Sequence, residues 1–233
     1  MGFDELGRRV VLVTGGTRGI GREVVRLLAP SWRVLVGGRS VSDVSAVVDD
    51  CPDAAGFVCD LTDEDAVASA IASVEELDAV VHSAGVAIRG TAEEVTREEF
   101  RRVLEMNVVA VADLTRLLLP ALRAARGQVV VINSGSGFVA GPANGIYAAT
   151  KFAARAWADS LRDEERGVVR VCSVHPGRVD TDMQVELQAA EGRSYDVAKL
   201  LTPLSVAKAV QFALEADPDA CVESVSVRPA ARW

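Results

Sequence analysis

The chain has 233 residues, of which 49% are hydrophobic, and carries a formal net charge of −8. This length supports one hydrophobic core and requires no second one, so we expect a single domain over residues 1–233. The negative charge disfavours nucleic acid and anionic membranes as partners, because both attract basic surfaces. The apolar runs are too short to span a bilayer, and the N-terminal MGFDELGRR has no apolar signal core, which predicts a cytoplasmic protein.

The four cysteines, Cys51, Cys59, Cys172 and Cys221, include no Cys-x-x-Cys spacing. Only two histidines are present to complete a zinc site with them. We therefore expect neither a bound metal nor a disulfide framework.

Taken in chain order, short valine-rich runs alternate with segments of helical period. The runs that read as buried strands are Val10–Thr14, Arg33–Gly37, Gly56–Cys59, Ala79–His82, Val129–Ser134, Val169–His175 and Val222–Val227. The helical segments are Gly21–Ala29, Glu64–Val74, Glu98–Ala125, Tyr147–Glu165 and Ser205–Ala216. This alternation predicts a Rossmann-like α/β fold, in which a doubly wound parallel sheet of about seven strands has helices on both faces. The least patterned stretch, around residues 181–203, is the predicted substrate lid.

A glycine-rich turn, Thr14 to Gly21, leads from the first predicted strand into the first helix. Glycines let the backbone turn tightly and approach a pyrophosphate, while the free N–H groups and the dipole of the helix start stabilise its charge. An ordinary strand-to-helix turn is the alternative interpretation. The predicted cofactor contacts in this turn are Gly15, Thr17, Arg18, Gly19, Ile20 and Gly21.

The end of the second predicted strand indicates which dinucleotide is bound. It reads Val36-Gly37-Gly38-Arg39-Ser40, without the carboxylate that holds the ribose hydroxyls in folds that prefer NAD. Arg39 offers a planar, always-charged fork for a 2′-phosphate, and Arg18 is placed to reach the same group. Either arginine alone is compatible with an ordinary solvated charge. The two together, without an acid, predict NADP(H).

Tyr147 and Lys151 lie four residues apart at the start of a predicted helix and therefore share one face. A free tyrosine has a pKa of about 10, and a nearby ammonium favours the phenolate. The pair is therefore a candidate acid/base centre. A packed tyrosine beside a solvated lysine is the alternative.

These motifs resemble those of the short-chain dehydrogenase/reductase family, and the resemblance covers nearly the whole chain. The Thr-Gly-x-x-x-Gly-x-Gly turn of that family matches Thr14 to Gly21, and its Tyr-x-x-x-Lys matches Tyr147 and Lys151. The family places a serine thirteen residues before the tyrosine, which corresponds to Ser134, with Ser136 as the second candidate. The implied catalytic residues are Asn107, Ser134, Tyr147 and Lys151.

The resemblance also implies further cofactor contacts. These are Asp60 and Leu61 at the adenine, Ser83, Ala84 and Gly85 after the fourth strand, Tyr147 and Lys151 at the nicotinamide ribose, and Pro176, Gly177, Val179 and Thr181 at the nicotinamide amide. His82 and Ser83 stand where the family usually has two asparagines. Since Tyr147 already fills the acid/base position, we expect His82 to be a hydrogen-bonded structural residue, and His175 likewise.

The implied activity is hydride transfer between NADPH and a small ketone or aldehyde, or the corresponding alcohol, with Tyr147 as general acid/base. Family roles assign Lys151 to the ribose and to lowering the tyrosine pKa, and Asn107 to positioning a water. A small, uncharged substrate is expected, although Arg89, Arg178 and Arg193 are placed to approach the mouth of the site. Relatives form homodimers or homotetramers through the helices that correspond to Glu98–Ala125 and Tyr147–Glu165. The alternatives are a non-catalytic NADP-binding sensor and a dehydratase or epimerase.

Overall fold

The computed structural model describes residues 7–230 except 75, 191 and 193. Its strands form one parallel sheet in the order β3-β2-β1-β4-β5-β6-β7. Their bounds are β1 Arg9–Thr14, β2 Trp32–Gly38, β3 Ala54–Val58, β4 Ala79–His82, β5 Gln128–Ile132, β6 Arg170–Pro176 and β7 Ser224–Val227. Each predicted strand is present with slightly different ends, and the predicted doubly wound parallel sheet is confirmed.

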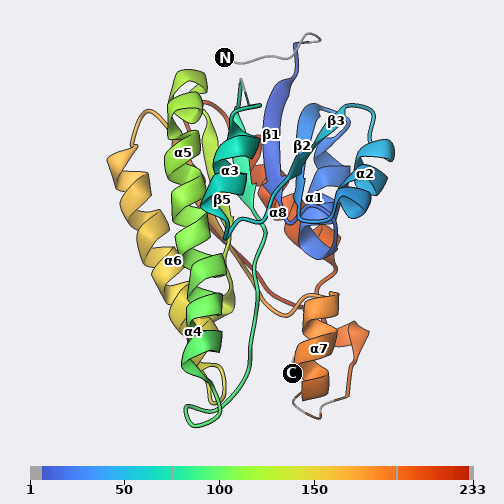
Figure 1. The fold of residues 1–233 in the computed structure, drawn as a ribbon, viewed down its shortest axis with the longest axis vertical. Coiled ribbons are helices and arrows are strands. Elements are labelled where there is room, and N and C mark those ends of the chain that lie inside the picture. Colours follow the sequence, from blue (N-terminus) through green and yellow to red (C-terminus); the bar gives the residue numbers. More distant parts are fainter. Residues whose placement is uncertain (1–6, 75, 191, 193, 231–233) are drawn as a thin grey trace.

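Helices cover both faces of this sheet. Their bounds are α1 Gly19–Leu28, α2 Val41–Asp49, α3 Glu64–Ile71, α4 Arg97–Leu104, α5 Ala110–Ala125, α6 Gly145–Glu164, α7 Asp182–Ala190 and α8 Pro203–Leu214. Figure 1 shows α3, α5 and α6 on one side of the sheet and α1, α2 and α8 on the other. In the described part of the chain, none of the helices combines the length and the apolar character needed to cross a membrane.

The central strands explain why the sheet forms from short valine runs. Every residue of β4 and β5 is buried, because helices cover both faces of the sheet there. Side chains alternate between the two cores, so Val11 and Val13 pack with α1 and α8 while Leu12 packs with α5. Burying each such side chain contributes about 1.5–3 kcal/mol, which makes the register of these strands costly to change.

Three segments differ from the sequence expectation. The predicted helix Glu98–Ala125 is divided into α4, a π-helical turn at Glu105–Val109, and α5. Helix α2 was not predicted, although Ser40 caps it by accepting the backbone N–H of Asp43. Helix α7 occupies part of the stretch expected to lack regular structure. Its apolar residues do not gather on one face, and of its described side chains only Gln188 is buried, so helical periodicity could not indicate it.

The order of strands reverses between β1 and β4, and the carboxyl ends of these two strands meet at a crevice. The Thr14 hydroxyl joins the two ends, since it accepts the N–H groups of Ser83 and Ala84 at 3.1 Å each. Gly15 follows with φ +63°, and a Cβ there would lie 2.9 Å from the Ala84 Cα. Glycine is therefore required at this position by conformation and by space.

His82 ends β4 and fastens it to α5. Its Nε2 lies 2.8 Å from the Thr115 hydroxyl oxygen, while that hydroxyl donates to the Val111 carbonyl at 2.7 Å. The histidine Nε2–H is therefore the donor to Thr115. His82 is 2% exposed, and burial lowers its pKa to about 3. The structural role expected for this histidine is confirmed.

The burial of His82 predicts a specific loss of stability in acid. The unfolded chain binds a proton near pH 6.5, whereas folded His82 binds it only near its lowered pKa of about 3. Stability must fall as the pH falls through this window, by up to about 1.4 kcal/mol per pH unit from this residue. Replacing His82→Gln keeps a donor for Thr115 and removes the titration. Denaturant melts between pH 7 and pH 4 should therefore show a flatter pH dependence for the variant, and parallel curves would contradict this account.

Candidate active site

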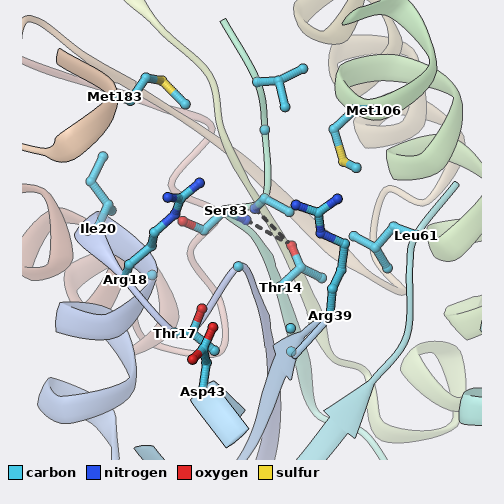
Figure 2. Close-up of a pocket in the computed structure, with 18 of the residues that line it drawn as sticks. Thr14, Thr17, Arg18, Ile20, Arg39, Asp43, Leu61, Ser83, Met106 and Met183 are labelled. Carbon is cyan, nitrogen blue, oxygen red and sulfur yellow. Dashed lines mark hydrogen bonds between the residues drawn. The ribbon is translucent and has the colours of Figure 1, made fainter. Parts of the chain in front are cut away.

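A cavity of about 420 Å³ opens at the carboxyl ends of β1, β2 and β4. Many residues predicted to contact a dinucleotide line it together (Figure 2): Gly15, Thr17, Arg18, Gly19, Ile20, Gly21, Arg39, Leu61, Ser83, Ala84, Gly85 and Thr181. The glycine turn and the loop after β4 both line this cavity. Two arginines and the backbone of a glycine turn among its lining residues suit an anionic ligand.

The glycine turn presents the start of α1 to this cavity. Gly16 N–H donates to the Gly37 carbonyl at 2.8 Å, and a Cβ on Gly21 would lie 2.1 Å from the Gly15 carbonyl oxygen. No side chain caps the N-terminus of α1, and its first turn contains no acidic residue. The N–H groups of that turn are thus left for another acceptor, and the helix dipole favours a negative charge there.

Charged side chains gather where β2 ends. Arg39 lies 3.8 Å from the Asp60 carboxylate, and the backbone N–H and hydroxyl of Thr62 both donate to Asp60, which lowers the pKa of that carboxyl. Asp60 therefore faces Arg39 and Thr62, while the neighbouring Leu61 lines the cavity. Arg18 and Asp43 line the cavity too, as Figure 2 shows. Sequence reasoning missed Asp43, because only the unpredicted helix α2 brings it to the site.

The loop after β5 brings Ser134 to Tyr147. The Ser134 hydroxyl oxygen accepts the backbone N–H of Ser136 at 3.1 Å, and the interaction of the Ser134 side chain with the Tyr147 hydroxyl lowers the pKa of that tyrosine. Ser136, the second candidate, instead accepts the side-chain amide of Asn144 at 3.1 Å. The structure thus pairs Tyr147 with the serine that the family spacing indicates.

The electrostatics at Tyr147 differ from the expectation. Burial raises the pKa of Tyr147, and the hydrogen bond from Ser134 and the positive charge of Arg89 only partly oppose this effect. The Lys151 Nζ lies 5.7 Å from the centre of the tyrosine ring and donates to the Ile132 carbonyl at 3.0 Å. Burial lowers the pKa of Lys151 to about 8. Lys151 is not among the groups that lower the pKa of Tyr147 in this structure, and desolvation leaves that pKa raised.

Asn107 lies in the π-helical turn between α4 and α5. Its side chain accepts the Val86 N–H at 2.9 Å, and its amide nitrogen donates to the Val86 carbonyl at 2.8 Å and to the Thr150 hydroxyl at 3.1 Å. The amide hydrogens therefore brace the loop after β4 against α6. A π turn of this kind is frequent at functional sites.

The segment expected at the nicotinamide amide continues from β6. Gly177 N–H donates to the Val227 carbonyl at 2.7 Å, and Val179 forms a parallel bridge with Leu201. Pro176, Gly177 and Val179 do not line the cavity, whereas Thr181 does. Figure 1 shows α7, within the predicted lid, beyond the carboxyl ends of the strands. Arg193, one of the cations expected near the mouth, lies outside the described residues.

Residues 9–192 match a family model described as short chain dehydrogenase. The match covers well over half of the chain, so the chain belongs to the short-chain dehydrogenase/reductase family, whose members are oxidoreductases. The family that the motifs indicate is therefore confirmed.

Named relatives are similar over most of the chain. A bovine "Dehydrogenase/reductase SDR family member 7B" is 30% identical over 227 residues, which cover 88% of this chain and 70% of that protein. The chain covers 62% of the rat protein of the same name. A bovine "L-fucose dehydrogenase" is 34% identical over 78% of this chain and 70% of its own length. An alcohol dehydrogenase from Thermococcus sibiricus, solved with 5-hydroxy-NADP, is 26% identical with a TM-score of 0.87, over 97% of this chain and 98% of its own.

The contact between Ser134 and Tyr147 can be measured directly, because the chain contains only two tyrosines. Burial, together with Asp180, raises the pKa of the other one, Tyr195, to about 12. In a Tyr195→Phe background, tyrosinate absorbance near 295 nm therefore reports Tyr147 alone. Adding Ser134→Ala should raise the Tyr147 midpoint, because the hydrogen bond that stabilises the phenolate is lost. Ser136→Ala is the matched control and should leave it unchanged; the reverse pattern would assign the contact to Ser136.

Proposed function

We propose that this protein is an NADP(H)-dependent oxidoreductase that transfers a hydride between NADPH and a small ketone or aldehyde, or the corresponding alcohol. The observation that carries the proposal is the interaction of the Ser134 side chain with the Tyr147 hydroxyl, whose pKa it lowers, with the buried Lys151 on the same helix face as the tyrosine. Two neighbouring hydroxyls are what a carbonyl reductase needs to bind and protonate one oxygen.

The residues at the cavity fit NADP(H). The uncapped start of α1 and the glycines around it would receive the pyrophosphate, and Arg18 and Arg39 would hold the 2′-phosphate. Thr181 lines the same cavity, and its Cγ2 would lie 3.4 Å from a Cβ on Gly19 of the glycine turn. The bound cofactor supplies the hydride. The NADP analogue in the Thermococcus relative supports this assignment.

Ser134 and Tyr147 supply the protein's part of the chemistry. Both hydroxyls would hydrogen-bond the carbonyl oxygen of the substrate, and Tyr147 would donate its proton as negative charge develops there. Burial raises the pKa of Tyr147, so the phenol holds its proton at neutral pH, which suits reduction of a carbonyl. A positioned general acid contributes roughly 10²- to 10⁴-fold to such a rate.

Lys151 and Asn107 support this pair. With a pKa lowered to about 8, Lys151 remains largely protonated at neutral pH and can donate to the ribose hydroxyls. Asn107 holds the loop after β4 through Val86, and so keeps one wall of the site in place while it positions a water for the proton relay. Residues 181–203 serve as the substrate lid.

The principal alternative is a non-catalytic NADP-binding sensor, and the complete set of hydroxyl and ammonium groups argues against it. We further propose a homodimer or homotetramer that packs through α4, α5 and α6. The exposed side chains of Phe100, Val109 and Phe152 on and between these helices support that assembly. We also propose a cytoplasmic location, because the apolar runs of the sequence are too short to span a bilayer.

Replacing Tyr147→Phe should nearly abolish turnover and leave NADPH affinity within about threefold, because the proton donor is lost and the ring is kept. The assay follows NADPH consumption with aldehydes, cyclic ketones, quinones and keto-esters, and NADPH fluorescence measures affinity. Turnover equal to that of the wild type would rule out Tyr147 as the acid. Tight NADPH binding without turnover of any compound would favour the sensor.

Cofactor preference should respond in opposite directions to the charge of Arg39, directly after β2, and to that of Asp43, on α2. Arg39→Asp should shift affinity from NADPH toward NADH by about tenfold or more, since hydrogen bonds to charged groups contribute about 1.5–3 kcal/mol. Asp43→Asn removes a carboxylate from the same cavity and should shift affinity toward NADPH. Fluorescence titrations of both cofactors measure each ratio, and an unchanged ratio in Arg39→Asp would remove Arg39 from the phosphate site.

A further inference from the structure

Arg228, the residue directly after β7, reaches back to the end of β6. Its Nη1 donates to the His175 carbonyl and, at 3.1 Å, to the Val227 carbonyl. A guanidinium is suited to such a bridge, because its donors are fixed in one plane. Arg228 thereby joins the carboxyl ends of two parallel strands next to the Pro176–Gly177 segment.

The same side chain packs on the backbone of two loops at the site. A Cβ on Gly135 would lie 3.1 Å from Arg228 Nη2, so the guanidinium rests on residues 134–138 after β5, the serine loop, which carries Ser134. A Cβ on Gly177 would lie 3.3 Å from Arg228 Cδ and 2.9 Å from Pro229 Cδ. Glycine at both positions permits this approach. Arg228 thus contacts the serine loop and the segment expected at the nicotinamide at the same time.

His175 extends the contact to Ser134 itself. Its Nδ1 lies 3.3 Å from the Ser134 carbonyl oxygen, and its ring centre is 4.5 Å from that of Phe138, at the other end of the serine loop. Arg155 lies over the Phe138 ring at 4.5 Å. Burial lowers the pKa of His175, and the hydrogen bond to the Ser134 backbone opposes this effect. The charges of Arg155 and Arg228 lower the pKa further, while Asp159 raises it. A neutral His175 therefore connects Arg228 to the backbone of Ser134.

We propose that Arg228 is a positioning residue for the reaction: by holding His175 and packing on Gly135 and Gly177, it fixes the serine loop so that the Ser134 hydroxyl meets Tyr147. The kinetic part of this inference rests on the proposed oxidoreductase function. The geometric part concerns only the contact between Ser134 and Tyr147, and it can be tested without turnover.

The chain provides a matched control at the other end of the same two strands. Arg162 donates from Nε to the Val171 carbonyl at 2.9 Å and from Nη2 to the Glu223 carbonyl at 3.1 Å. It therefore joins β6 to the start of β7 as Arg228 does, but at the amino ends of the strands, away from the serine loop. The Arg162 side chain is only 11% exposed, whereas Arg228 lies at the surface, so Arg162→Ala should destabilise the fold at least as much.

The first readout is the ionisation of Tyr147, followed at 295 nm in the Tyr195→Phe background. Arg228→Ala should raise the Tyr147 midpoint in the direction of the Ser134→Ala variant, because a less fixed serine loop weakens the hydrogen bond that favours the phenolate. Arg228→Lys keeps one donor for the His175 carbonyl and should give an intermediate midpoint. Arg162→Ala should leave the midpoint unchanged.

The second readout is the kinetics of NADPH-dependent reduction, with the same variants and the best substrate from the panel. Arg228→Ala should lower kcat by about tenfold to a hundredfold with little change in KM, since small displacements of positioning groups have effects of this size. Arg228→Lys should recover part of kcat, and Arg162→Ala should retain it.

The proposal is overturned if the Tyr147 midpoint of Arg228→Ala equals that of the Tyr195→Phe protein without it. It is also overturned if Arg162→Ala shifts the Tyr147 midpoint equally, because Arg228 then has only a general structural role. If Arg228→Ala fails to fold, Arg228→Lys serves the same test, and an unchanged Tyr147 midpoint in that variant overturns the proposal. If the wild-type protein reduces none of the compounds, the oxidoreductase proposal fails while the titration still tests the role of Arg228.

Discussion

The hydroxyl of Thr14, at the end of β1, accepts the N–H groups of Ser83 and Ala84 at the end of β4, and the rest of the site depends on this contact. It lies where the strand order reverses, so two loops must leave the sheet in opposite directions and still meet. Gly15 allows the backbones to touch, because a Cβ there would lie 2.9 Å from the Ala84 Cα. The cavity, the uncapped start of α1 and the loop that Asn107 braces all follow from this junction.

Burial dominates the electrostatics on the catalytic side of the site. It raises the pKa of Tyr147, lowers that of Lys151 to about 8 and lowers that of His82 to about 3. Each shift favours the neutral form of the group, as expected where water is excluded. The consequence is a tyrosine that keeps its proton and a histidine that serves structure alone. A bound, positively charged nicotinamide would change this balance in favour of the phenolate.

The cofactor side of the site is organised differently, with exposed charges instead of buried ones. Arg39 is paired with Asp60, and Asp43 reaches the same cavity from α2. Ion pairs at the surface contribute little to stability, so these side chains are free to serve ligand selection. On the side of Ser134 and Tyr147, His175 connects the serine loop to β7: its ring Nδ1 contacts the Ser134 carbonyl, and its own carbonyl accepts a hydrogen bond from Arg228. Under the proposed function, cofactor selectivity and positioning of the serine would thus reside in different elements.

The sequence by itself determined the parallel sheet, the glycine turn and the placement of Tyr147 and Lys151 on one helix face. Each follows from a local pattern: valine runs, glycines at a helix start, and residues four apart. The choice of Ser134 also followed from family spacing. Only the tertiary structure decided what depends on neighbours distant in the chain. It brought Asp43 into the cavity through α2, turned the Lys151 ammonium toward Ile132, and placed Arg228 against the serine loop. Desolvation and backbone contacts of this kind arise from packing, which local spacing does not record.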